Sequence, residues 1–84
     1  MHRKHLKTLE IIFSNPVNGN LEWSRIEALF IAIGCNVLEG NGSGVMFEKD
    51  GAREYFHRPH PDKAALRYRV KAAKEFLVRL GYKG

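Results

Sequence analysis

The sequence contains a single cysteine and no cluster of cysteine and histidine residues with the spacing of zinc ligands. Cys35 therefore has no partner for an internal disulfide, and we expect neither a structural metal nor a cofactor. Because Cys35 follows Gly34 and enters an apolar segment, we interpret it as a packed thiol and not as a nucleophile. A lone cysteine is typical of a reducing compartment, so the predicted location is the cytoplasm.

Long hydrophobic runs are also absent. No segment is apolar over the length that a signal peptide or a membrane span requires, so we expect no membrane partner. Because repeats and linkers are lacking as well, the 84 residues predict one domain. Residues 1–20 are expected to form an N-terminal helix and loop, with Leu6, Leu9 and Phe13 on one helical face. Residues 21–84 are expected to form the core.

Acidic residues are few compared with basic ones. Fourteen lysines and arginines against nine aspartates and glutamates give a net charge of +5. This balance favours a polyanion such as RNA, or an acidic protein, as the partner over a small neutral ligand.

Two further segments have the apolar spacing of helices. Residues 23–33 end at Gly34, and Ser24 and Glu27 have the spacing of a capping box at the start of this segment. Residues 63–80 end at Gly81 and carry a second stripe that we expect to be buried. The stripes consist of Trp23, Ile26, Leu29, Phe30 and Ile33 in the first segment, and of Leu66, Val70, Ala73, Leu77 and Leu80 in the second.

Between these segments the apolar period changes to that of strands. Residues 36–39, 45–49 and 52–57 predict three strands, and Asp50-Gly51 favours a two-residue hairpin turn. The predicted fold is therefore α+β, with a three-stranded antiparallel sheet whose one face is covered by helices.

The two-residue turn also fixes the register of the hairpin, because Lys49 must oppose Ala52. Counting outward, Gly44 opposes His57 at the far end. Since side chains alternate between faces, Val45, Phe47 and Phe56 are expected to face the helices. Glu54 falls on the same side, which is unusual for a carboxylate. The side chains expected on the open face are those of Met46, Glu48, Arg53, Tyr55 and His57.

Two histidines at the end of the third predicted strand are the strongest candidates for chemistry. An imidazole can exchange a proton near neutral pH, so His57 on the open face could act as an acid or base on RNA. The ordinary alternative is a pair of surface histidines. His60 lies between two prolines, and is either a second catalytic group or a cap for the final helix.

Basic residues near these histidines could hold phosphate, and Tyr55 could stack on a base. Along the final helix, basic residues recur at helical spacing with few acids between them, which favours either phosphate contact or a solvated face. Glu75 and Arg79 form an ordinary pair four residues apart. The residues expected to bind RNA are Ser43, Arg53, Tyr55, Arg58, Lys63, Arg67, Lys71 and Lys74.

A capped helix, a short strand, Gly42-Ser43, a hairpin, His60-Pro61 and a closing helix follow one another in this order. Over about residues 22–81, this order resembles the HicA toxins of bacterial toxin–antitoxin pairs. The resemblance implies a fold like the double-stranded-RNA-binding domain, ribonuclease activity on mRNA, and neutralisation by a HicB-like antitoxin that covers the active face. Because an acid or base and nearby cations can cleave RNA without a metal, we expect a metal-independent endoribonuclease.

The chain departs from this family pattern at one position. Where the resemblance implies a catalytic histidine, or an arginine, directly after Gly-Ser, this chain has Gly44. Either His57 is the working group and Gly44 leaves space for the substrate backbone, or Gly44 marks an inactive form. Two other functions stay open: a module that binds RNA without cutting it, and a basic interaction domain for an acidic antitoxin.

Overall fold

The computed structural model describes residues 1–83. Three helices and three strands follow in the order α1 (Arg3–Ile12), α2 (Trp23–Ala32), β1 (Asn36–Glu39), β2 (Gly44–Lys49), β3 (Ala52–His57) and α3 (Arg67–Arg79). The strands form one antiparallel sheet in the order β1-β2-β3. The α+β class and the three-stranded sheet predicted from the sequence are therefore confirmed, and the element order from α2 to α3 is like that of a double-stranded-RNA-binding domain.

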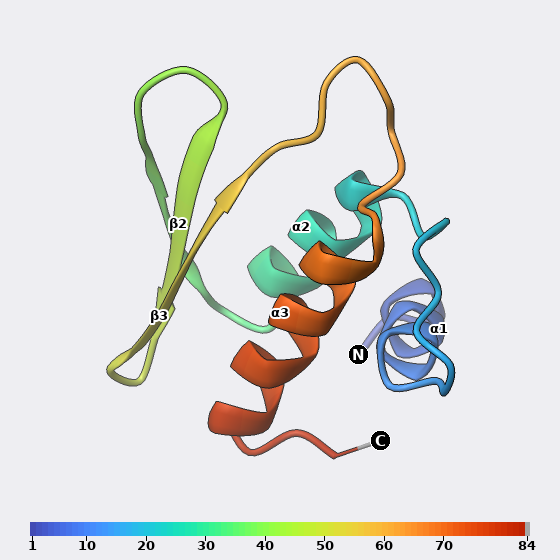
Figure 1. The fold of residues 1–84 in the computed structure, drawn as a ribbon. Coiled ribbons are helices and arrows are strands. Elements are labelled where there is room, and N and C mark those ends of the chain that lie inside the picture. The colour runs from blue at the N-terminus through green and yellow to red at the C-terminus, as the bar shows by residue number, and fades with distance from the viewer. Residues whose placement is uncertain (84) are drawn as a thin grey trace.

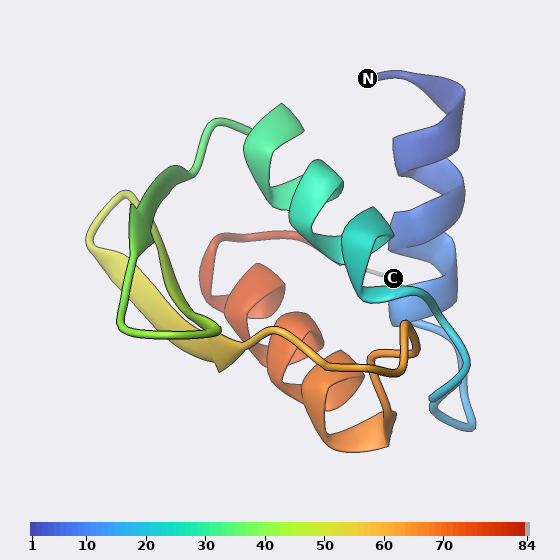
Figure 2. The same cartoon turned by 90° about the horizontal axis from the view of Figure 1, so that it is seen from above.

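The elements are arranged in layers (Figures 1 and 2). Helices α2 and α3 cover one face of the sheet, and α1 lies on the far side of these two helices. The other face of the sheet has no element over it within residues 1–83. Among these residues, no helix is long and apolar enough to cross a membrane.

The core between the sheet and the helices is built largely from aromatic rings. Phe30 of α2 is fully buried, and its ring centroid lies 4.9 Å from that of Phe47 on β2 and 5.2 Å from that of Phe76 on α3. Trp23 packs on Phe56 of β3 at 5.0 Å. Such tilted and edge-on ring pairs add to the stabilisation that burial provides. Cys35 is buried at the edge of this core, as predicted, and burial raises the pKa of its thiol.

The predicted hairpin register is confirmed at every pair from Lys49–Ala52 to Gly44–His57. Asp50 and Gly51 both have positive φ, 51° and 83°, as the central residues of a type I′ turn require. Glu54 lies on the helix side of β3, and there it bonds to Arg79 at 2.6 Å. The predicted pair between Glu75 and Arg79 is wrong, because the arginine reaches across to the sheet.

Two predictions about the helices are also wrong. The expected capping box is not formed: α2 has Glu22 at its N-cap without a side-chain hydrogen bond, and the Glu27 carboxylate bonds to other groups. Helix α3 begins at Arg67 and not at residue 63. Its N-cap, Leu66, has φ 71° and a side chain 44% exposed, so Leu66 is not part of the buried stripe.

The late start of α3 has a physical cause in the segment before α2. The Trp23 amide donates to the Lys63 carbonyl at 2.9 Å, and the Ala65 amide donates to the Leu21 carbonyl at 2.8 Å. The Leu66 amide donates to the Gly19 carbonyl at 3.0 Å. These bonds hold residues 63–66 extended beside residues 19–23, and they satisfy backbone groups that a helix would otherwise pair.

Candidate active site on the open face of the sheet

His57 stands on the open face at the end of β3, where the hairpin register predicted it. Its side chain is exposed, and its ring lies edge-on to the Tyr55 ring at 5.2 Å. The cross-strand neighbour of His57 is Gly44. The imidazole is therefore reachable from solvent, with an aromatic ring on one side and the Gly-Ser turn across from it.

The space at Gly44 is not empty, which corrects the expectation that this glycine makes room for substrate. The Tyr55 side chain lies diagonally across β2, and a Cβ on residue 44 would collide with the Tyr55 hydroxyl. A Cβ on residue 40 would lie 3.0 Å from the same oxygen. The Tyr55 ring thus packs on the backbone of Gly40 and Gly44. Residues that are diagonal neighbours across two strands lie close enough for an aromatic ring to make such a contact. Tyr55 remains 45% exposed in spite of this contact.

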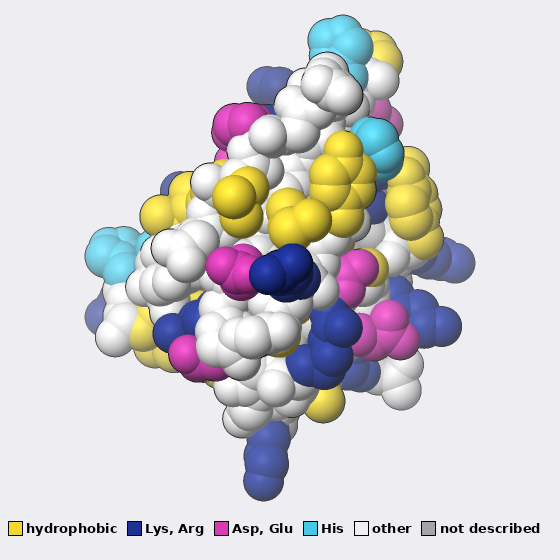
Figure 3. Space-filling view, turned by 90° about the vertical axis from the view of Figure 1, so that its left-hand side faces the viewer, with side chains coloured by type: hydrophobic (Ala, Val, Ile, Leu, Met, Phe, Trp, Pro, Cys, Tyr) yellow, Lys and Arg dark blue, Asp and Glu magenta, His cyan; other side chains and the backbone are white. Residues whose placement is uncertain are grey.

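Hydrophobic side chains gather on the open face above a basic and acidic pair (Figure 3). Leu38 of β1 is 50% exposed and lies beside Met46 and Tyr55 in the sheet register. The pair below is Arg53 with Glu48, whose atoms lie 2.7 Å apart. Arg53 is on the open face as predicted, with part of its charge compensated by the carboxylate.

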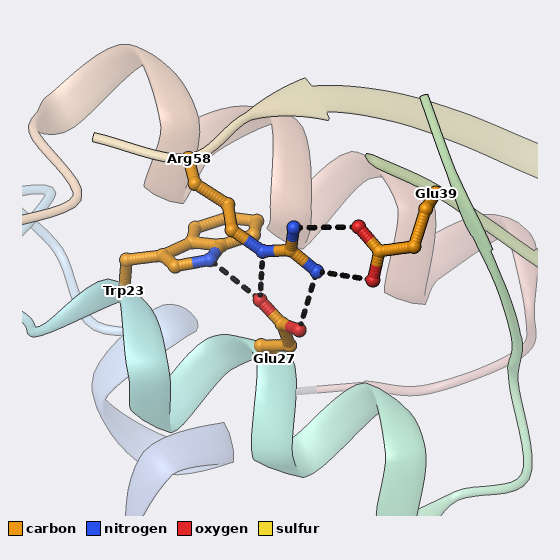
Figure 4. A network of polar contacts seen from close by, with 4 residues as sticks. All are labelled: Trp23, Glu27, Glu39 and Arg58. Atoms are coloured by element: carbon orange, nitrogen blue, oxygen red, sulfur yellow. Dashed lines mark hydrogen bonds and ion pairs between the residues drawn. The ribbon is translucent and has the colours of Figure 1, made fainter. Parts of the chain in front are cut away.

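Arg58 lies on the opposite side of the sheet from His57, in an ion-pair network with two glutamates (Figure 4). Its Nε and Nη2 donate to Glu27 at 2.9 Å each, and its Nη1 and Nη2 donate to Glu39 at 2.8 and 3.0 Å. Trp23 donates its indole N–H to Glu27 at 2.8 Å. All three guanidinium nitrogens are occupied, so Arg58 is not the free phosphate ligand that we expected.

This network shifts the pKa values of its members. The hydrogen bond from Arg58 is the main cause that lowers the pKa of Glu27, and it also lowers the pKa of Glu39. The two carboxylates in turn raise the pKa of the Arg58 guanidinium. Arg58 therefore ties β3 to α2 and to the end of β1, which fixes the chain just after His57.

A small hollow of about 140 Å³ opens beside His57, between β3 and α3. Arg69 is one of its lining residues and bonds to two carbonyls: Nε donates to the His57 carbonyl at 2.7 Å and Nη1 donates to the Ala65 carbonyl at 3.2 Å. The guanidinium carbon also lies 4.7 Å from the centroid of the Tyr68 ring. The hollow is lined by Tyr55, Phe56, His57, Tyr68, Arg69 and Ala72.

The basic stripe predicted for the final helix is not adjacent to His57. Lys71 and Lys74 line a second hollow with Val17, on the flank of α3 that faces α1. Lys74 also lies 5.8 Å above the ring of Phe13. Arg67, at the start of α3, packs against Gly19 on that same flank. Their positions do not join them to His57 in one surface, and their role as RNA ligands stays a prediction.

Three other predicted site residues lie in loops. Ser43 is exposed in the turn before β2, and its carbonyl accepts from the Arg58 amide at 2.9 Å. His60 and Lys63 lie in the segment between β3 and α3 and are exposed. His60 does not cap α3, because the N-cap is Leu66 without any side-chain bond. Lys63 precedes α3 and so is not on its basic stripe.

Sequence reasoning missed Tyr68 and Arg69, the residues that face His57 from α3. One signal was present: Glu54 on the helix side of a strand requires a cation from the covering helix. Placing Arg79 against Glu54 orients α3 and brings Tyr68 and Arg69 to the same edge. Within residues 1–83, no group of three acidic, histidine or cysteine side chains could hold a metal ion.

Comparisons of the chain with protein-family models, with curated proteins and with solved structures found no match.

Proposed function

We propose that the chain is an endoribonuclease that cleaves mRNA in the cytoplasm, as the toxin of a toxin–antitoxin pair of the kind that HicA and HicB form. The observation that carries this proposal is the position of His57. Its exposed imidazole stands at the end of β3, beside Tyr55 and across from the turn that contains Ser43. The order of elements from α2 to α3 and the basic charge of the chain also support it.

The proposed reaction uses the ribose 2′-hydroxyl and needs no metal. His57 accepts the 2′-hydroxyl proton, O2′ forms a bond to phosphorus, and the bond from phosphorus to O5′ breaks. The leaving O5′ takes a proton from a water molecule, and His57 afterwards returns its proton to solvent. Arg69, whose Nη2 is not used in its two backbone hydrogen bonds, supplies positive charge near the phosphorane. The products are a 2′,3′-cyclic phosphate and a 5′-hydroxyl.

Gly44 determines how active this chain is. We propose that a cationic side chain at position 44 is needed for full activity, because Arg58 is held by Glu27 and Glu39 and cannot serve in its place. A longer side chain at position 44 must displace the Tyr55 ring, and the exposure of Tyr55 gives its ring room to turn.

A HicB-like antitoxin is the proposed protein partner. Leu38 and Tyr55, with the partly exposed Met46 between them, present apolar surface on the open face, of the kind that a protein partner buries. Arg53 lies next to them and suits an acidic partner. Covering this face would hide His57, so binding and inhibition would be one event.

RNA binding without cleavage is the second candidate. The observation that favours it is the Tyr55 ring over Gly44, because an exposed aromatic on a sheet face can stack on a base without any catalytic group at position 44.

The test is cleavage of an end-labelled single-stranded RNA in the presence of a chelator. We expect the natural chain to cleave weakly, Gly44→Arg and Gly44→His to cleave faster and to arrest growth when induced, and His57→Ala in either background to be inactive. His5→Ala, a histidine on α1 remote from the sheet, serves as the matched control and should not change cleavage. Mapping the 2′,3′-cyclic phosphate identifies the reaction.

The outcomes separate the candidates. Full activity of the His57→Ala variants would refute the role of His57. If the position-44 variants all bind the RNA and none of them cleaves it, the chain is a module that binds RNA without cutting it. If neither the chain nor its position-44 variants bind or cleave RNA, the remaining candidate is a basic domain that binds an acidic protein.

A further inference from the structure

The outer edge of β3 is held at two points by arginines from α3. The His57 carbonyl accepts from Arg69 at 2.7 Å, and the Arg53 carbonyl accepts from Arg79 at 3.1 Å. Both carbonyls point away from β2. Arginine side chains on a strand edge prevent other strands from adding there, because they take the groups that pairing needs.

Tyr55 lies midway between these two clamped residues. In an antiparallel strand, the N–H and C=O of alternate residues point to the same side. Since the carbonyls of Arg53 and His57 point outward, the backbone N–H and C=O of Tyr55 do so as well. Within residues 1–83, no group from α3 bonds to them. The N–H and C=O of Tyr55 therefore offer one donor and one acceptor side by side, between two carbonyls that the arginines occupy.

The hollow between β3 and α3 opens at this point of the edge. Tyr55 and Phe56 line it from β3, and Tyr68 and Ala72 line it from α3. Tyr68 is 63% exposed, and the Arg69 guanidinium carbon lies 4.7 Å from the centroid of its ring. This contact holds the Tyr68 ring in place in the lining of the hollow, which the Tyr55 residue also lines.

The groups around the hollow favour a flat heterocyclic ligand over a peptide strand. A peptide strand that added here would also need the carbonyls of Arg53 and His57 as acceptors, and the two arginines occupy both of them. A flat heterocycle with a donor and an acceptor on adjacent edge atoms fits one residue's backbone and one aromatic face. RNA-binding proteins recognise unpaired bases in this way, by stacking and by hydrogen bonds to the base edge.

We propose that the hollow between β3 and α3 is a subsite for one unpaired nucleobase, which stacks on Tyr68 and bonds to the Tyr55 backbone. This inference rests on the proposed ribonuclease function and names its substrate: RNA that is single-stranded at the cleaved position. Because His57 lines the same hollow, the ribose of the bound nucleotide comes next to the imidazole.

The probe for this subsite is a single-stranded 2′-O-methyl RNA, which cannot be cleaved through its 2′ oxygen. Tyr68→Ala is expected to weaken its binding by roughly tenfold, the size of one lost base–aromatic stack, and Tyr68→Phe to bind as the natural chain does. Val78→Ala is the matched control, because Val78 is an exposed apolar residue on the other flank of α3. Circular dichroism checks that each variant is folded.

A second measurement locates the contact. In amide NMR spectra, a nucleoside 5′-monophosphate should shift the Tyr55 amide and the Tyr68 signals, and inorganic phosphate at the same concentration should not.

The result that overturns the subsite is equal binding by Tyr68→Ala and the natural chain, or a Tyr55 amide that the nucleotide does not shift. If His57-dependent cleavage is nevertheless observed, the ribonuclease proposal stands and only the subsite is lost. If the NMR and binding effects are found without cleavage, the subsite stands in a protein that binds RNA and does not cut it. Absence of any binding by the natural chain overturns the subsite as well.

Discussion

Gly44 and Tyr55 act as one unit on the open face. The glycine is buried under the tyrosine ring although it lies in a strand that faces solvent, and any side chain on it collides with the ring. A glycine in a strand interior normally lowers stability, because it adds backbone entropy to the unfolded chain and contributes no packing. Here the cross-strand aromatic supplies the packing that the glycine lacks.

A double-mutant cycle tests this coupling. Gly44→Ala alone is expected to destabilise the chain by about 0.5 to 1 kcal/mol, because it displaces the ring from the glycine backbone on which it packs. In a Tyr55→Ala background the same change should stabilise by about 0.5 kcal/mol, because alanine then replaces a strand glycine without a clash. Urea unfolding of the four proteins measures both values. Equal effects in the two backgrounds would show that the residues are independent.

Glu27 carries the pH dependence at the residue scale. Arg58 holds its pKa below the ordinary value of 4.5, so the unfolded chain binds protons first as the pH falls. The stabilisation is therefore complete above that value and is lost as the pH falls through the lower pKa of the folded protein. Glu27→Gln should lower the free energy of unfolding by about 1 to 2 kcal/mol at pH 7. Urea unfolding at several pH values should also show that the stability of this variant falls less steeply with acid than that of the natural chain.

Glu39→Gln is the control for this prediction, since Glu39 is bound to the same arginine but is exposed. Glu39→Gln should lower the free energy of unfolding less than Glu27→Gln does, because solvent screens the pair between Glu39 and Arg58. Stability that falls with pH as steeply in Glu27→Gln as in the natural chain would contradict the assignment.

At the scale of elements, the sequence predicted what local signals determine. The three strands and the hairpin register follow from alternation and from Asp50-Gly51, and both are confirmed. The start of α3 could not be predicted in this way. Residues 63–66 have helical apolar spacing, and only their hydrogen bonds with residues 19–23, far away in the sequence, keep them extended.

The same junction places a strained residue at the start of α3. Leu66 has φ 71° and ψ 158°, a conformation that glycine adopts freely and a branched side chain does not. Because the Leu66 side chain is half exposed, Leu66→Gly should raise the free energy of unfolding by about 1 kcal/mol. Leu66→Ala keeps the strain and should give no gain. Thermal unfolding of the two variants measures these effects. A Leu66→Gly variant that is less stable than the natural chain would contradict the prediction.

Across the whole molecule, the candidate site was predictable only in part. The face on which His57 lies follows from the hairpin alone, because register and alternation are local. The grouping of the cations does not, because it depends on how α3 rotates against the sheet. Arg69 faces His57, whereas Lys71 and Lys74 face α1. A basic stripe in a sequence therefore says little about which surface it serves.

Salt dependence tests this division of charge. Each phosphate contact adds close to one unit to the slope of log binding constant against log salt concentration. We expect Arg69→Gln to lower the slope for single-stranded RNA by about one unit, and Lys71→Gln with Lys74→Gln to leave it unchanged. Titrations at several salt concentrations measure the slopes. A lower slope in the double variant would show that RNA extends over the far flank of α3.

The layered arrangement also determines through which end the protein can be immobilised with its open sheet face accessible. Helix α1 stands behind α2 and α3, so the amino end of the chain lies on the α1 side of the molecule and not over the bare sheet (Figures 1 and 2). A tether fused ahead of Arg3 would anchor the protein to a sensor chip with its His57 side turned toward the flowing solution. Immobilised in this orientation, one preparation could be offered nucleic acid and acidic protein in turn, and their competition for the same surface could be observed directly.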